Sequence, residues 1–171
     1  YLEYDNQNSV LQTPDGGYLI GGSSMSTDIT GTTNKGDFDY YIIKLDSSGN
    51  INWQKMFGGA SYDSLRSIQK LSDGNYLING DSGSKPYILK IDINGNIIRQ
   101  IGAGYLSYEY NHKIQETSDS GFICYSGNYY QYYDYSSYQY INYASQYYIM
   151  KLNSSGDSVW SIMLGGISSD E

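Results

Sequence analysis

The sequence predicts an all-β protein built from three copies of one four-stranded antiparallel unit. Composition is the first observation: the 171 residues include 22 Tyr and 20 Gly but only 2 Pro. Tyr is enriched in strands and Gly, Asn and Ser in turns, whereas the helix formers Ala, Glu and Lys are rare here. The second observation is an internal repeat, and the third is a tight turn that recurs within it.

The opening half of each unit predicts two short strands joined by a tight turn. In the first copy we expect strands at 9–13 and 17–22, with Asp15-Gly16 between them. Asp-Gly flanked by apolar residues is a strong hairpin signal. Segments 67–78 and 113–124 match this half in the other copies. Cys124 falls in the apolar centre of a second strand, and we interpret it as a small buried hydrophobe.

The closing half predicts a third strand at 40–45, a turn at 46–50 and a fourth strand at 51–57. Segments 87–99 and 148–160 align with 41–53 without a gap. Asp at the start of such a turn can accept hydrogen bonds from backbone N–H groups, and Trp in the fourth strand is expected to pack between or under the units. The residues of this half with an expected structural role are Trp53, Trp160, Asp46, Asp92, Gly49, Gly95 and Gly156.

The repeat also predicts the domain organisation. We expect one repeat domain over 1–171, with units at about 4–59, 60–104 and 105–166, and the start of a further copy at 167–171. Equivalent acidic residues mark the joints: Asp5, Asp63, Glu109 and Asp170. Central apolar residues of the second and third strands form the expected core: Leu19, Ile20, Ile42, Ile43, Leu77, Ile78, Ile88, Leu89, Ile123 and Ile149.

These motifs resemble a family of secreted bacterial and archaeal β-propeller repeats, often called seven-bladed propeller repeats. The resemblance covers essentially the whole chain. It is carried by Ser67-Ile68-Gln69, Asp15-Gly16-Gly17-Tyr18, Lys44-Leu45-Asp46 with Gly49-Asn50 and Trp53, and Gly58-Gly59. The turn followed by Trp also resembles the docking motif of quinoprotein propellers, in which the Trp packs between blades. In the second copy Arg99 replaces the Trp.

The resemblance implies propeller-type blades, an extracellular location and a role as a scaffold or adhesion module. Three blades do not close a ring, because propellers have four to eight. The expected architecture is therefore a partial propeller. We expect either a segment of a larger chain or copies that associate to complete a ring or filament, since open sheet ends are adhesive edges.

Charge excludes several classes of partner. The chain carries 10 Lys and Arg against 18 Asp and Glu, a formal net charge of -8, and its basic residues are scattered. Nucleic acids and anionic membranes bind clustered basic residues, so neither is an expected partner. No apolar run approaches the roughly 18 residues of a membrane helix, so membrane insertion is not expected either.

The residues that could carry chemistry do not form a recognisable catalytic set. His112 is the sole histidine, and no Gly-x-Ser-x-Gly elbow or phosphate-binding loop occurs. We therefore expect a protein that is not an enzyme and needs no cofactor. Calcium is the alternative to this expectation, since it favours closely spaced oxygen ligands, and the candidate ligands are Asp37 and Asp39.

The most pointed feature is a Tyr-rich insertion in the third copy, between its second and third strands, at 127–147. Tyrosine offers rigid, amphipathic contact area at low entropic cost. We expect this segment to bind a partner, or alternatively to form an extended hairpin whose tyrosines pack on each other. The candidate binding residues are Tyr129, Tyr130, Tyr132, Tyr133, Tyr135, Tyr138, Tyr140 and Tyr143.

The function expected from the sequence is a non-catalytic extracellular or cell-surface scaffold. It would mediate protein–protein assembly, with other chains or with itself, in a surface layer, sheath, filament or adhesin. A carbohydrate-binding module, with glycans as partners, is the first alternative. A fragment of a propeller enzyme such as a lyase or sialidase is the second.

Overall fold

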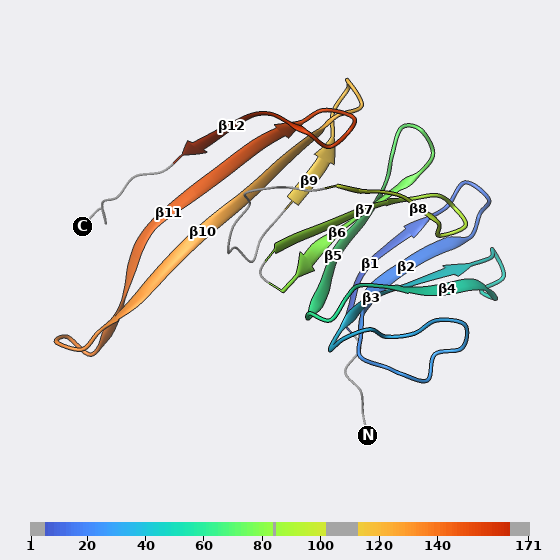
Figure 1. The fold of residues 1–171 in the computed structure, drawn as a ribbon, viewed down its shortest axis with the longest axis horizontal. Coiled ribbons are helices and arrows are strands. Elements are labelled where there is room, and N and C mark those ends of the chain that lie inside the picture. Colours follow the sequence, from blue (N-terminus) through green and yellow to red (C-terminus); the bar gives the residue numbers. More distant parts are fainter. Residues whose placement is uncertain (1–5, 84, 102–112, 165–171) are drawn as a thin grey trace. The chain divides into compact units, whose positions relative to one another are not determined.

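A computed structural model describes residues 6–83, 85–101 and 113–164, with side chains described outside 6–8, 127–134 and 139–146 (Figure 1). The described residues form three four-stranded antiparallel sheets and no helix, which confirms the predicted all-β class. In each sheet the strands are neighbours in chain order. This meander is the simplest pairing for strands joined by tight turns.

The strand bounds follow the repeat. The first sheet contains β1 (Asn6–Gln12), β2 (Tyr18–Ser24), β3 (Asp39–Leu45) and β4 (Ile51–Phe57). The second sheet contains β5 (Asp63–Lys70), β6 (Tyr76–Ser82), β7 (Lys85–Ile91) and β8 (Ile97–Ile101). The third sheet contains β9 (Lys113–Glu116), β10 (Phe122–Asp134), β11 (Gln139–Leu152) and β12 (Ser158–Leu164).

The register repeats as closely as the sequence does. Lys44 of β3 lies opposite Trp53, Lys90 of β7 opposite Arg99, and Lys151 of β11 opposite Trp160. The pairing then shifts by one residue directly after each lysine. Such a bulge increases the local twist and redirects the strand that leaves the turn. The three sheets are therefore copies of one structure and not only of one sequence.

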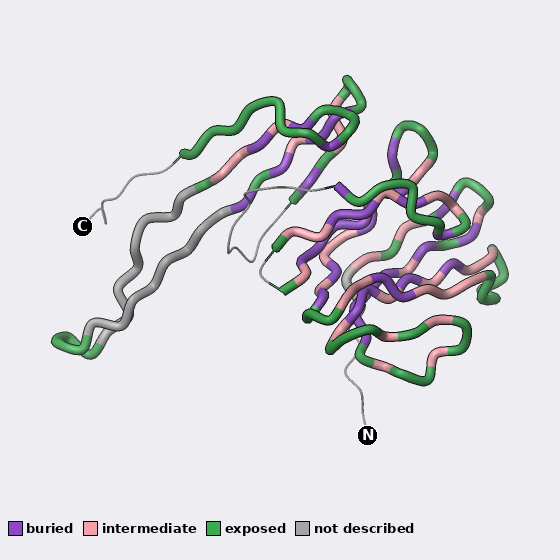
Figure 2. The backbone as a smooth tube through the Cα atoms, viewed as in Figure 1, coloured by how far each residue is buried: buried purple, intermediate pink, exposed green. Residues whose placement is uncertain are grey.

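Contacts divide the chain into two compact units, Tyr1–Gly102 and Ala103–Glu171. The first unit contains the first and second sheets, which share a core (Figure 2). A twisted sheet of this size has too little apolar surface to fold alone, so packing one sheet on the next supplies the stability. The core residues are Leu19, Tyr40, Ile42, Phe57, Leu65, Ile68, Tyr76, Ile78, Leu89 and Ile91.

The predicted core residues divide by the alternation of side chains along a strand. Six are buried: Leu19, Ile42, Leu77, Ile78, Ile88 and Leu89. Four are only half-buried: Ile20, Ile43, Ile123 and Ile149. In the third sheet the buried residues are instead their neighbours Cys124 and Met150, with Phe122 and Leu152. Adjacent residues point to opposite faces, so in the first and third sheets choosing a centre one residue away selects the wrong face. In the second sheet the adjacent pairs Leu77-Ile78 and Ile88-Leu89 are buried on both faces.

Polar side chains also join the first two sheets. The Ser23 hydroxyl accepts a hydrogen bond from the backbone N–H of Leu65 at 2.8 Å. The Tyr40 hydroxyl donates to the carbonyl of Tyr87 at 2.7 Å, and the centroids of the two rings lie 5.2 Å apart. The Ser23 and Tyr40 side chains are both buried. Directional hydrogen bonds therefore fix the packing of the first sheet on the second, in addition to apolar contact.

Within the described ranges, no helix is long and apolar enough to cross a membrane.

Candidate interaction site

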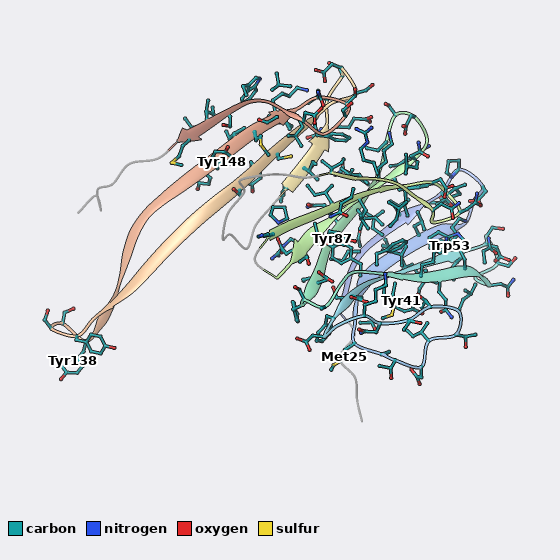
Figure 3. All side chains as sticks on the ribbon, viewed as in Figure 1. Met25, Tyr41, Trp53, Tyr87, Tyr138 and Tyr148 are labelled. Atoms are coloured by element: carbon teal, nitrogen blue, oxygen red, sulfur yellow. The ribbon has the colours of Figure 1, made fainter. Side chains whose placement is uncertain are left out.

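The Tyr-rich insertion of the third sheet forms a long hairpin. Its backbone extends β10 and β11 to 13 and 14 residues, and cross-strand pairing continues to Asp134 opposite Gln139. The insertion is therefore mostly strand, and its backbone agrees with the extended-hairpin alternative. At the end of the hairpin Tyr135 is 82% exposed and Tyr138 is 80% exposed (Figure 3).

The remaining predicted tyrosines lie along the two hairpin strands. Tyr130 pairs with Tyr143 and Tyr133 with Tyr140 across the strands, and Tyr129 falls at an irregularity in the pairing. The side chains of Tyr129, Tyr130, Tyr132, Tyr133, Tyr140 and Tyr143 lie outside the described part of the structure. The hairpin thus places six of the eight candidates on one projecting ribbon and the other two at its exposed tip.

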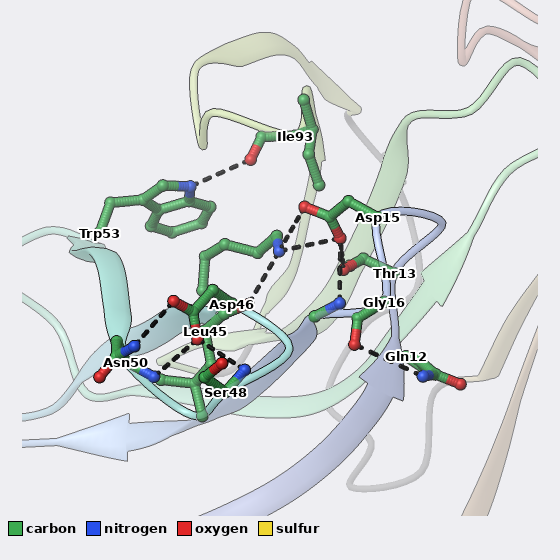
Figure 4. A network of polar contacts seen from close by, with 12 residues as sticks. Gln12, Thr13, Asp15, Gly16, Leu45, Asp46, Ser48, Asn50, Trp53 and Ile93 are labelled. Carbon is green, nitrogen blue, oxygen red and sulfur yellow. Dashed lines mark hydrogen bonds and ion pairs between the residues drawn. The ribbon is translucent and has the colours of Figure 1, made fainter.

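A second candidate surface is built around Trp53 of β4. The indole Nε1 donates a hydrogen bond to the carbonyl of Ile93 in the second sheet at 3.0 Å (Figure 4). Lys55 lies beside it, with Nζ 5.5 Å from the Trp53 ring and donating to the carbonyls of Asn94 and Gly95 at 2.8 and 2.9 Å. Trp53 and Lys55 together hold the β7–β8 turn against the first sheet.

The β7–β8 turn is shaped by Asp92. Its Oδ1 accepts from the backbone N–H groups of Asn94 and Asn96, and its Oδ2 accepts from the Asn96 amide. Gly95 has a φ of 71°, in the left-handed region that glycine tolerates. A Cβ at Gly95 would lie 2.9 Å from Cη2 of Trp53, so the glycine also makes room for the indole.

The first sheet has the same turn without an indole on it. Asp46 accepts from the N–H groups of Ser48 and Asn50 and from the Asn50 amide (Figure 4). Gly49 has a φ of 87°, and nothing lies within 4 Å of the position of a Cβ there. In the third sheet Asn153 makes the corresponding bonds to Ser155 and Asp157, and Gly156 has a φ of 85°.

Trp160 is the third-sheet counterpart of Trp53, because both lie opposite the lysine that precedes the bulge. Its side chain is 45% exposed, and within the described residues its indole makes no hydrogen bond. Its neighbours on β12 are exposed and apolar: Val159, Ile162, Met163 and Leu164. The Trp53 indole therefore packs on the β7–β8 turn, whereas the Trp160 indole is half-exposed to solvent.

The structure also reveals a recurring ion pair that the motif analysis missed. In each sheet the lysine before the bulge bonds the aspartate of the first tight turn: Lys44 with Asp15 at 2.9 Å, Lys90 with Asp73 at 2.5 Å, and Lys151 with Asp119 at 2.9 Å. Lys44 is buried. Hydrogen bonds from Thr13, and then from Lys44, lower the pKa of Asp15 to about 2. The signal in the sequence was the joint recurrence of both residues in all three copies.

The residues considered for catalysis or metal binding are scattered. His112 lies outside the described residues, as do Asp5, Glu109 and Asp170. Cys124 is buried, and burial raises the pKa of its thiol to about 12. Asp37 is exposed, whereas Asp39 is fully buried. The described ranges contain no group of three or more His, Cys, Asp or Glu residues arranged to hold a metal ion.

Comparison with known proteins assigns no function to these residues. No family model and no curated protein matches the chain. One similar solved structure is the crystal structure of a protein of unknown function from Bacteroides caccae. It is 13% identical to this chain with a TM-score of 0.42, and the alignment covers 92% of this chain. The chain spans 66% of the length of that protein.

Proposed function

We propose that this chain is a non-catalytic extracellular or cell-surface scaffold whose three sheets are propeller-type blades. It assembles with other protein chains, including copies of itself, in a layer, sheath or filament. The third-sheet hairpin is the partner-binding element. The observation that carries this proposal is the length of that hairpin.

The hairpin is longer than the fold of its own sheet requires. The corresponding strands of the first two sheets are 7 residues each, whereas β10 and β11 have 13 and 14. Six further residues in extended conformation add about 20 Å to a ribbon. A two-stranded ribbon of this kind is only marginally stable in water. An extension that ends in two exposed tyrosines is therefore best explained by a partner that packs against it.

Native mass in solution tests this proposal. We expect light scattering after size exclusion to show association that increases with protein concentration. Replacing the two tip residues together, by Tyr135→Ser and Tyr138→Asn, is expected to weaken that association. Asn is used at 138 because Tyr138 has a φ of 56°, which Asn tolerates. Tyr125→Ser, at a partly exposed site in β10 away from the tip, is the matched control.

Two outcomes would redirect the proposal. A monomer at every concentration would contradict self-assembly. A monomer whose tyrosine fluorescence changes with a polysaccharide, and loses that response in the tip variant, would support the carbohydrate-binding alternative instead.

A further inference from the structure

Two aspartates at the joint of the first and second sheets are fully buried. Asp39 begins β3 and Asp63 begins β5, and both have an exposed fraction of 0%. Each carboxylate accepts one backbone hydrogen bond at its Oδ2, from Lys35 to Asp39 and from Gly59 to Asp63, both at 2.7 Å. The Oδ1 atom of each is buried and has no hydrogen-bond partner among the described residues.

The two carboxylates lie side by side against Gly58. A Cβ on this glycine would lie 2.0 Å from Oδ1 of Asp39 and 2.4 Å from Oδ2 of Asp63. The segments that carry them are also joined directly. The backbone N–H of Asp63 donates to the carbonyl of Phe38 at 2.7 Å, and the Phe38 and Tyr62 rings lie 4.9 Å apart. The pair is therefore enclosed by loops from both sheets.

Within the described ranges no basic side chain forms an ion pair with Asp39 or Asp63. The ion pairs found there join other acids: Lys44 with Asp15, Arg66 with Asp81, Lys90 with Asp73, and Lys151 with Asp119. Two ionised carboxylates in one buried site repel each other and lose hydration without compensation. The site therefore requires a positive charge, which either a shared proton or a bound cation could supply.

The unpartnered oxygens favour the cation. Oδ1 of Asp39 and Oδ2 of Asp63 both lie against Gly58, so a proton shared between these two atoms leaves Oδ1 of Asp63 without a partner. A cation that contacts both carboxylates can also use that atom.

We propose that Asp39 and Asp63 bind a divalent cation of the calcium class, which joins the first sheet to the second. Calcium prefers carboxylate and carbonyl oxygens and takes six to eight of them. The two aspartates supply the charged ligands, and backbone carbonyls and water complete the shell. Asp37, which the sequence suggested as a ligand, has no part in the proposed site because its side chain is exposed.

Terbium luminescence of the full chain tests the site directly, since Tb³⁺ replaces Ca²⁺ and is sensitised by nearby tyrosines such as Tyr40. We expect one saturable site per chain, displaced by Ca²⁺. Asp39→Asn and Asp63→Asn should each weaken Tb³⁺ binding at least about tenfold, because each removes a charged ligand. Asp37→Asn, in the same loop, should bind as the unaltered chain does.

Thermal unfolding provides the second measurement. Ca²⁺ should raise the unfolding midpoint of the unaltered chain and a chelator should lower it, because a ligand that binds only the folded state stabilises it. The Asn variants should lose this response. Absence of saturable Tb³⁺ binding by the unaltered chain would overturn the proposal even if the variants fail to fold. A stable, calcium-insensitive Asp39→Asn at neutral pH would indicate a shared proton instead.

Discussion

At the scale of single residues, Ser120 shows how the repeat tolerates a departure from its own pattern. Ser120 occupies the place of Gly16 and Gly74 and keeps their left-handed backbone, with a φ of 60°. That conformation is strained for any residue with a Cβ. We expect Ser120→Gly to stabilise the chain by about 0.5–1 kcal/mol in urea unfolding. Gly74→Ser should destabilise the chain by a similar amount. Nothing lies within 4 Å of a Cβ at Gly74, so the strained backbone is the main cost of that substitution.

The Lys44–Asp15 pair makes a prediction about acid. The pKa of about 2 for Asp15 lies below the ordinary 3.8, so the folded state favours the ionised carboxylate. Its contribution to stability is present at neutral pH and is lost as pH falls from about 4 toward 2. We expect Asp15→Asn to lower the thermal midpoint at pH 7 and to differ little from the unaltered chain near pH 2.

The control for the acid experiment is Asp28→Asn, which changes an exposed acid by the same single charge. A difference between Asp15→Asn and the unaltered chain that stays constant from pH 7 to pH 2 would contradict the assignment. It would show that Lys44, which is buried, does not depend on the ionised Asp15.

At the scale of elements, the turn that receives Trp53 can be tested against its own copy. Gly95→Ala and Gly49→Ala place a Cβ at similar left-handed φ angles, so both carry the same backbone strain of about 1–2 kcal/mol. Only Gly95→Ala also meets the Trp53 ring, at 2.9 Å. We expect it to cost about 1–3 kcal/mol more, with a change in tryptophan fluorescence. Equal losses for both variants would show that the indole adapts freely.

The comparison of elements also shows what local sequence can predict. Each strand and tight turn was predictable because its signals, such as Asp15-Gly16 or the Asp46 turn, act within a few residues. For the insertion at 127–147 the sequence leaves a partner-binding segment and an extended hairpin both open, because insertions in a repeat often lie on a binding face whereas tyrosine favours strands. The two residues of the Lys44–Asp15 ion pair come from different parts of one copy, and Asp39 and Asp63 come from different copies. No local sequence pattern connects the members of either pair.

At the scale of the whole molecule, the repeat presents two halves of one contact. Trp53 of the first sheet occupies the β7–β8 turn of the second, through the bond to Ile93 and the space beside Gly95. The β3–β4 turn has the same hydrogen bonds and an open Gly49, while Trp160 is exposed on an apolar strand. The indole part of this geometry can therefore form between the third sheet of one copy and the first sheet of another, although Ile162 stands where Lys55 donates to the turn.

If copies associate in this way, each should contribute a different half of the contact. We expect Trp160→Ala and Gly49→Ala each to reduce association in light scattering, and Ile97→Thr, at a comparably exposed apolar site, to leave it unchanged. An equimolar mixture of the two variants is the decisive sample. Each copy retains one intact half, so the mixture should recover pairs that neither variant forms alone. If both variants associate as the unaltered chain does, the β12 face and the β3–β4 turn are not the contact, and assembly depends on the hairpin alone.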